Sequence, residues 1–374
     1  MVHQRNTSHP YSGALIVDRV EVRVAAVPLR RPIVSNVGVY KEWPFILVDL
    51  MTRQGVVGRS YLEPYVLNSA KFIVPAIEAL ADGLIGKPVA PIRNFEQAIN
   101  LLHLHGRQGL SLIATAAMDM ALWDALAKSA GVPLAVLLGG TIEPVRAYNT
   151  NGLWLIPLER IAAEARELIE EGKFSAIKIR LGRQTLKDDL AALSEVRNTV
   201  GDEVKLMADF NQCMTFAQAL HRLHALDDQD LYWFEEPIVF DNYEGCAQLA
   251  RELKTPLQIG ENIYGPRDFY LAVKTQASDF YMPDLMRIGG VTGFLKCAAI
   301  AGAAGLPLSN HLYPEFSAHL LKACETADWL EWRDWGNPLL KDPFEVKDGF
   351  VVIPDRPGAG IEWDERAVQR YSAS

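Results

Sequence analysis

The feature that most constrains the fold is a series of short apolar segments that recur from about residue 145. They read VRAYNT, AIKIRLG, VKLMADF, LYWFEEP, LQIGEN, DFYMPD, LPLSNHL and DWLEWRD, and helical stretches such as LERIAAEARELIEEG separate most of them. Eight strands with intervening helices predict an α/β fold with a closed TIM-type barrel. The last gap, from Asn310 to Asp328, leaves room for one irregular or short helical link.

Residues 15–65 favour strands joined by turns, with a Pro- and Gly-bearing loop expected at 31–44. Helical patterns follow from about 68 to 138. The segment IATAAMDMALWDALAKSAG ends at Gly131, with Pro133 beyond it, as helices often end. This part of the chain therefore predicts an α+β domain in front of the barrel.

The change from this α+β pattern to alternating strands and helices sets the expected domain boundaries. The segment FVVIPDRPGAGIEWDE, near the end of the chain, is expected to be extended and to return to the first domain. We expect a disordered tail at 1–14, an N-terminal α+β capping domain at 15–140, the barrel with the catalytic site at 141–345, and a C-terminal segment at 346–374.

Composition excludes several classes of protein. With 49% hydrophobic and 22% charged residues, the chain is an ordinary globular one. A net charge of -9 without a basic stripe argues against a nucleic-acid partner. The polar first residues predict no signal peptide, and no run approaches the roughly 20 apolar residues of a membrane span. The dispersed cysteines form no CxxC and fit a reduced cytoplasmic protein: Cys213, Cys246, Cys297 and Cys324.

Polar residues stand at the end of nearly every predicted barrel strand, where catalytic groups of such barrels lie. In AIKIRLG, Lys178 and Arg180 share one face, because side chains two apart on a strand do. The other strand ends carry Asp209 with Asn211, then Glu235, Glu261, Asp284, His311 and Glu331. Asp209, Glu235 and Glu261 are 26 and 26 residues apart, which is one βα unit each. This regularity carries more weight than any single residue.

Three carboxylates on successive strands would repel one another at one barrel mouth unless a cation neutralised them. A hard divalent ion with oxygen ligands does so, and Mg²⁺ suits one oxygen per strand plus water and substrate. We therefore predict a metal site on Asp209, Glu235 and Glu261, with Mg²⁺ ahead of Mn²⁺.

Candidate bases flank this predicted metal. Asp284 beside His311 would fix the imidazole tautomer and raise its basicity. Lys178 would lie across the mouth, where the positive field of the metal should lower its pKa. This arrangement suits abstraction of a proton next to a carboxylate, with the metal holding the enediolate charge.

Each of these residues alone has an ordinary explanation. A lone Asp after a strand is more often a helix N-cap, and a strand-end Lys usually reaches solvent. The glycine-rich RIGGVTG lacks the ending of a phosphate loop and indicates a tight turn. The HLH and HRLH segments fall in helical stretches, so we interpret them as surface histidines rather than zinc ligands.

Six segments, in this order, resemble the enolase superfamily, in particular its mandelate racemase subgroup (the mandelate racemase/muconate lactonizing enzyme family). They are MADFNQ, WFEEP, IGEN, MPDLMRIGGVTGF, SNHLYPEFSAHLL and PGAGIEWDE, and the resemblance runs from about residue 15 to the end. The resemblance implies an α+β capping domain over a modified (β/α)7β barrel. It likewise implies a metal on Asp209, Glu235 and Glu261 and a His–Asp dyad of His311 and Asp284.

The resemblance also implies roles for further residues. Glu331 matches a glutamate that donates a hydrogen bond to the substrate carboxylate, and Lys178 matches the first lysine of a Lys-x-Lys motif. Asn211 matches a polar residue near the metal. Loops at 32–44 and 58–65 would close over the substrate, with Tyr65 as a contact.

Two positions depart from the racemase pattern. Arg180 replaces the second lysine of Lys-x-Lys, which puts two-base racemisation in doubt because Arg stays protonated near neutral pH. Glu63 stands where the racemase carries an apolar aromatic residue, which suggests a more polar substrate.

The sequence thus predicts a Mg²⁺-dependent enzyme that takes the α-proton of a small hydroxy-carboxylate, with dehydration of a sugar acid to a 2-keto-3-deoxy acid as the leading reaction. A racemase or epimerase of a 2-hydroxy acid is the alternative. A non-catalytic binding protein on the same scaffold and a zinc hydrolase are more distant ones. A homo-oligomer is expected from the resemblance alone.

Overall fold

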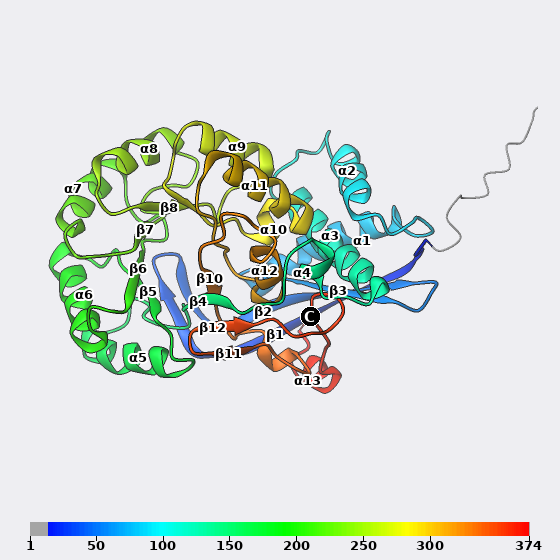
Figure 1. The fold of residues 1–374 in the computed structure, drawn as a ribbon, viewed down its shortest axis with the longest axis horizontal. Coiled ribbons are helices and arrows are strands. Elements are labelled where there is room, and N and C mark those ends of the chain that lie inside the picture. The colour runs from blue at the N-terminus through cyan, green and yellow to red at the C-terminus, as the bar shows by residue number, and fades with distance from the viewer. Residues whose placement is uncertain (1–13, 374) are drawn as a thin grey trace, which may run out of the picture.

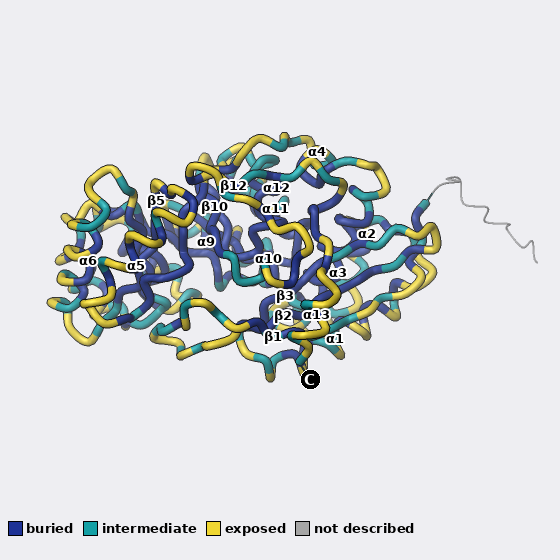
Figure 2. The backbone as a smooth tube through the Cα atoms, turned by 90° about the horizontal axis from the view of Figure 1, so that it is seen from below, coloured by how far each residue is buried: buried dark blue, intermediate teal, exposed yellow. Residues whose placement is uncertain are grey.

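The computed structural model describes residues 14–373 (Figure 1). The tail expected at 1–14 lies outside the described residues except for Ala14. Buried residues concentrate inside the barrel and between the cap sheet and its helices, whereas the outward helix faces are exposed (Figure 2).

The cap contains a three-stranded antiparallel sheet of β1(Val17–Ser35), β2(Gly38–Thr52) and β3(Val57–Leu62), in that order. The loop expected at 31–44 is wrong, because pairing of β1 with β2 continues to Ser35 and Gly38 and leaves only a tight turn. Of the two prolines that suggested a loop, Pro32 lies where the register shifts between Pro28 and Ile33, whereas Pro44 pairs with Ala26 within the sheet.

Helices cover this sheet. They are η1(Leu67–Ser69), α1(Ala70–Asp82), α2(Pro91–Leu101), α3(Leu110–Ala130) and α4(Leu134–Leu137). As predicted, the long apolar helix ends at Gly131, which adopts a left-handed conformation with φ 70°. Helix α3 is long and apolar enough to cross a membrane, but 78% of that stretch is buried inside the protein, so it is a core helix. Gly58 lets β3 approach α3, since a Cβ there would lie 2.1 Å from the Ala121 carbonyl oxygen.

The barrel strands run parallel in chain order, and β10 pairs with β4 to close the ring. They are β4(Val145–Asn149), β5(Ala176–Arg180), β6(Lys205–Asp209), β7(Trp233–Glu235), β8(Leu257–Ile259), β9(Phe280–Tyr281) and β10(Leu330–Trp332). The segment LPLSNHL fills the seventh position, but through isolated bridges such as Tyr281 to Leu308 rather than a regular strand.

Helices form the outer layer of the barrel (Figure 1). They are α5(Leu158–Glu170), α6(Leu186–Val200), α7(Phe216–Leu226), α8(Tyr243–Glu252), α9(Gly265–Lys274), α10(Leu285–Ile288), α11(Gly290–Ala304) and α12(Pro314–Leu321). Helix α12 lies in the gap where a short helical link was expected. The predicted fold class, a modified (β/α)7β barrel with an α+β cap, is confirmed.

The C-terminal part first joins the barrel and then the cap. After η2(Asn337–Leu339), β11(Glu345–Lys347) and β12(Phe350–Val352) form a hairpin that pairs with β4, so the hairpin straddles the boundary expected at 345. Beyond it, Trp363 donates its Nε1 hydrogen to Asp49 Oδ1 of the cap at 3.0 Å. The last helix, α13(Glu365–Arg370), precedes Tyr371, whose carbonyl accepts from the Ala26 amide.

Candidate active site

A cavity of about 240 Å³ lies where the cap meets the carboxyl ends of the barrel strands. Its barrel side includes most of the predicted site residues: Lys178, Arg180, Asp209, Asn211, Glu261, His311 and Glu331. Its cap side includes Tyr65 and the β1–β2 hairpin, represented by Ile33, Ser35, Val37, Tyr40 and Trp43. The strand ends and the cap hairpin, far apart in sequence, thus enclose one site.

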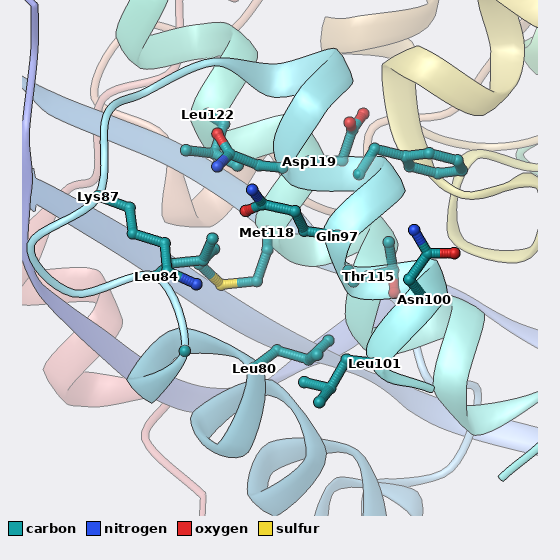
Figure 3. A pocket seen from close by; sticks show the side chains of 14 residues that line it. Leu80, Leu84, Lys87, Gln97, Asn100, Leu101, Thr115, Met118, Asp119 and Leu122 are labelled. Atoms are coloured by element: carbon teal, nitrogen blue, oxygen red, sulfur yellow. The ribbon is translucent and has the colours of Figure 1, made fainter. Parts of the chain in front are cut away.

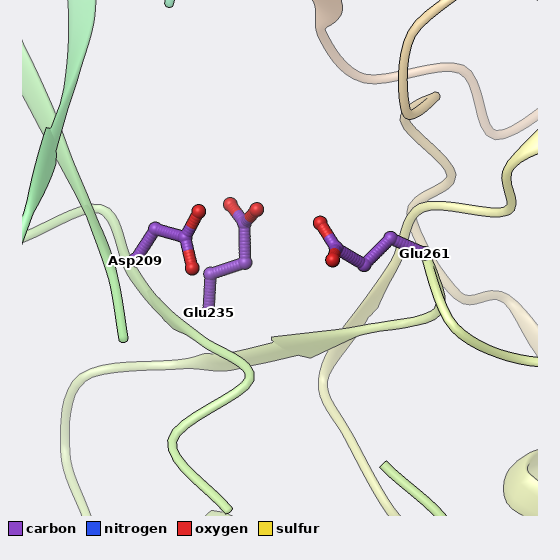
Figure 4. Close-up of side chains that lie close together, drawn as sticks. All are labelled: Asp209, Glu235 and Glu261. Atoms are coloured by element: carbon purple, nitrogen blue, oxygen red, sulfur yellow. The ribbon is translucent and has the colours of Figure 1, made fainter. Parts of the chain in front are cut away.

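The three carboxylates predicted to bind metal converge (Figure 4). Each of Asp209, Glu235 and Glu261 offers an oxygen, and these oxygens all lie within 4.8 Å of one another. Parallel register explains the convergence, because Asp209 at the end of β6 pairs with Glu235 at the end of β7. Glu261 follows β8 after Gly260, whose φ of 136° turns the chain. All three side chains are buried.

Each ligand candidate is held by a neighbouring donor. Asn211 donates its backbone N–H to Asp209 Oδ1 at 2.8 Å and its side-chain amide to Oδ2 at 3.1 Å. The indole of Trp233 donates to Glu235 Oε2 at 3.0 Å. The amide of Asn262 donates to Glu261 Oε1 at 2.9 Å. These donors fix the carboxylates in position, as outer-shell partners of metal ligands do.

The electrostatics of this cluster fit a hard divalent cation. Burial raises the pKa of Glu235 well above its usual value, and Asp209, Glu331 and Glu261 add repulsion that Lys178 only partly offsets. Three buried carboxylate oxygens form the donor set that Mg²⁺ takes in proteins. The residues present therefore fit the expected ion.

Lys178 lies among these carboxylates. Its Nζ donates to Glu235 Oε1 at 2.6 Å and to Glu331 Oε1 at 2.7 Å, and lies 3.6 Å from Asp209 Oδ2. Burial lowers the pKa of Lys178, but the three carboxylates outweigh it and raise the pKa above its ordinary value. The lowering of this pKa expected beside a bound metal stays a prediction, since the carboxylates by themselves act in the opposite direction.

His311 and Asp284 form the expected pair. His311 Nδ1 lies 2.7 Å from Asp284 Oδ2, while Nε2 faces the metal cluster, 3.2 Å from Glu261 Oε2. Asp284 is completely buried and its other oxygen accepts from the Arg287 backbone N–H at the start of α10, so it cannot turn away. Burial lowers the pKa of His311, but Glu261, Glu331 and Asp284 raise it to about 9.

Glu331 is positioned as an acceptor. Its Oε1 accepts from Lys178 and its Oε2 from the Leu312 backbone N–H at 3.0 Å. Burial raises the pKa of Glu331, yet Lys178 and His311 together lower it to about 2. The donor role implied by the resemblance needs a protonated carboxyl group, whereas this arrangement holds an ionised one.

Arg180 is fixed beside the cluster. Its guanidinium donates to the Thr150 and Gly152 carbonyls at 3.1 Å each and to Thr150 Oγ1 at 2.7 Å. It stacks over the Trp154 ring at 3.7 Å, and its Nε lies 3.7 Å from Asp209 Oδ2. Arg180 is thus a rigid cation at the wall of the cavity.

Of the two cap residues proposed as substrate contacts, one lines the cavity and the other does not. Tyr65 lines the cavity, and its hydroxyl accepts from Arg287 at 3.1 Å. Glu63 does not line it: the carboxylate is completely buried, accepts from Trp43 Nε1 at 2.7 Å and forms an ion pair with Arg333. The expected substrate contact of Glu63 is therefore corrected to a buried structural pair.

Sequence reasoning missed several residues that line the cavity. Trp154 and Trp335 come from irregular segments after β4 and β10, where no periodicity indicates the direction of a side chain. Arg287, three residues after Asp284, donates to the Glu261 carbonyl at 2.8 Å. A helix begun at Asp284 would have placed residue 287 near the dyad, so that signal was available.

A second cavity, of about 420 Å³, lies within the cap between α1, α2 and α3 (Figure 3). Its lining is mostly apolar and includes one carboxylate, Asp119. Both oxygens of Asp119 accept from Thr292, one from the backbone N–H and one from the hydroxyl. Asp119 therefore joins α3 to α11 and is not available to a ligand.

A cap over a (β/α)7β barrel, with three buried carboxylates between a lysine and a His–Asp dyad, defines a metal-dependent enzyme of the enolase superfamily. The chain belongs to the mandelate racemase/muconate lactonizing enzyme family: the model of its N-terminal domain matches residues 19–139, and the enolase C-terminal domain-like model matches 160–367.

The chain is also similar to known proteins along most of its length. It is 33% identical to L-talarate/galactarate dehydratase of Salmonella typhimurium over 94% of this chain and 90% of that protein. An enolase structure from alpha proteobacterium BAL199 with bound magnesium is 46% identical, with a TM-score of 0.94 over 96% of this chain and all of that one. A Bradyrhizobium enolase complexed with magnesium and mandelic acid is 38% identical, with a TM-score of 0.93 over 97% and 100% of the two chains. Other relatives are dehydratases, cycloisomerases, epimerases and racemases.

Proposed function

We propose that this enzyme dehydrates a sugar acid to a 2-keto-3-deoxy acid. The observation that carries the proposal is the asymmetry of the site. One side carries a histidine oriented by a buried carboxylate, and the other carries a lysine bound by two carboxylates beside an arginine. Elimination needs one base for the α-proton and one acid for the leaving hydroxyl, so it does not require two equivalent bases.

The residues of the site have different roles in this reaction. Asp209, Glu235 and Glu261 hold Mg²⁺, which when bound draws charge from the substrate carboxylate and makes the neighbouring proton more acidic. Lys178 and His311 flank the substrate: His311 takes the α-proton, and Lys178, whose charged form Glu235 and Glu331 stabilise, supplies the proton for the leaving hydroxyl. Asp284 keeps Nδ1 of His311 occupied, so that Nε2 is the atom that exchanges a proton with substrate.

Three further residues position the reactants. Arg180, held by Thr150 and Trp154, supplies a fixed positive charge for a substrate oxygen. Glu331 keeps Lys178 directed into the site. Asn211 holds both oxygens of Asp209. The homo-oligomer and the cytoplasmic location stay predictions.

A racemase or epimerase is the second candidate, because Lys178 and His311 come from opposite parts of the ring, on β5 and after β9. Lys178 would have to lose its proton despite Glu235 and Glu331, which stabilise its charged form. Proton NMR in D₂O with Mg²⁺ separates the two reactions. Keto-acid formation, with α-proton exchange slower than turnover, supports dehydration. Interconversion of both configurations without keto acid would make the enzyme a racemase.

A further inference from the structure

One wall of the cavity is aromatic and continuous. Trp43 of the cap lies 4.8 Å from Trp335 and 5.2 Å from Tyr65, ring centroid to centroid. Tyr40 lies 6.0 Å from Trp43, and Trp154 lies 6.2 Å from Trp335. We call these five residues the aromatic wall. It joins the cap hairpin to the loops after β4 and β10.

Among the described residues that line the cavity, the permanent cations are Lys178, Arg180 and Arg287, and none belongs to the cap hairpin. Lys178 is bound between Glu235 and Glu331. Arg180 approaches Asp209 and stacks on Trp154, while Arg287 donates to the backbone oxygen of Glu261 and to the Tyr65 hydroxyl. These two rings of the wall therefore meet cations, whereas the described lining of the hairpin offers only uncharged groups: Ile33, Ser35, Val37, Tyr40 and Trp43.

The aromatic wall does offer uncharged donors. The Nε1 of Trp154 is buried and has no hydrogen-bond partner within residues 14–373. The Nε1 of Trp43 is already occupied by Glu63. An indole N–H suits a hydroxyl oxygen, and aromatic faces suit the C–H surface of a carbon chain. A second carboxylate placed against the cap hairpin would lose its water without gaining a cation.

We infer that the substrate is a monocarboxylate with an uncharged, hydroxylated distal end, which is an aldonate rather than an aldarate. The inference rests on the proposed function for the sugar-acid part and on the uncharged lining of the cap hairpin for the single charge. It distinguishes this chain from its relative named as a talarate/galactarate dehydratase, whose substrates carry a carboxylate at each end.

The test compares ligands that differ only in distal charge. Calorimetry with the Mg²⁺-loaded His311→Asn variant, which blocks turnover, measures gluconate against glucarate, galactonate against galactarate, and mandelate against 4-carboxymandelate. For every pair in which binding is detected, we expect the monocarboxylate to bind at least about 100-fold more tightly than the dicarboxylate. Equal or tighter binding of the dicarboxylates overturns the inference, as does failure of every monocarboxylate to bind.

The mandelate pair keeps this result separate from the proposed function. If the enzyme binds mandelate more tightly than 4-carboxymandelate, as expected, but no sugar acid binds or reacts, the single-charge inference holds and sugar-acid dehydration fails. If sugar acids are dehydrated but aldarates are preferred, dehydration holds and the inference fails.

A gain of charge supplies a second test. Val37 lines the cavity, stands in the hairpin turn and is 67% exposed, so substitution there should not disturb folding. Val37→Arg should reduce the discrimination against dicarboxylates about 10-fold, and 0.5 M salt should weaken the effect. The matched variant Val37→Gln, polar but uncharged, should leave the ratio unchanged. If Val37→Arg also leaves it unchanged, the distal end does not face this hairpin and the inference is overturned.

Discussion

Glu63→Gln should destabilise the protein strongly while changing catalysis little. Glu63 is completely buried and Arg333 is 2% exposed, so the mutation leaves a buried guanidinium without its counter-charge. Removing one partner of a buried ion pair typically costs about 3–5 kcal/mol. Glutamine retains an oxygen for the Trp43 indole, which should hold the loss near the lower figure, about 3 kcal/mol.

The assay is urea unfolding followed by tryptophan fluorescence and by activity, with Glu96→Gln on the exposed face of α2 as the control for loss of a carboxylate. The double variant Glu63→Gln/Arg333→Met should recover part of the lost stability, because it removes the unpaired charge. KM of the folded Glu63→Gln enzyme should change less than about 3-fold, since the side chain does not line the cavity. A variant as stable as Glu96→Gln, with KM raised 10-fold or more, would refute the reasoning and return Glu63 to the substrate.

The remaining predictions concern the catalytic site. Chelation by EDTA should abolish turnover, and Mg²⁺ should restore it. Replacement of any one ligand, Asp209, Glu235 or Glu261, by the corresponding amide should weaken Mg²⁺ binding at least about 100-fold, measured by calorimetry. Persistence of full activity in excess EDTA would exclude the metal site. His311→Asn should remove turnover while substrate still binds, and Asp284→Asn should lower kcat less, by roughly 10- to 100-fold, because it weakens the imidazole without deleting it. Near wild-type turnover in His311→Asn would move the chemistry to Lys178. Arg180→Lys should not raise dehydration, though slow α-proton exchange in D₂O would show that a second base had been introduced.

The sequence by itself determined the barrel and the metal cluster. Strands of a parallel barrel end at the same mouth, so residues that end successive strands must approach one another whatever the details of packing. The even spacing of Asp209, Glu235 and Glu261 was therefore sufficient to place them together, and the same rule brought His311 to Asp284. The end of helix α3 could also be predicted from the sequence, because Gly131 and Pro133 end a helix through their own backbone preferences.

Only the tertiary structure decided the properties that depend on segments far apart in the chain. Glu63 follows the end of a strand, where alternation no longer fixes the direction of a side chain, and its partner Arg333 is 270 residues away. The raised pKa of Lys178 follows from three carboxylates on other strands, so no local pattern could indicate it. The aromatic wall takes Tyr40 and Trp43 from β2 and its other three rings from the irregular segments after β3, β4 and β10. Local periodicity reports which face of an element is buried, but the contacts between elements decide what a buried polar group meets there.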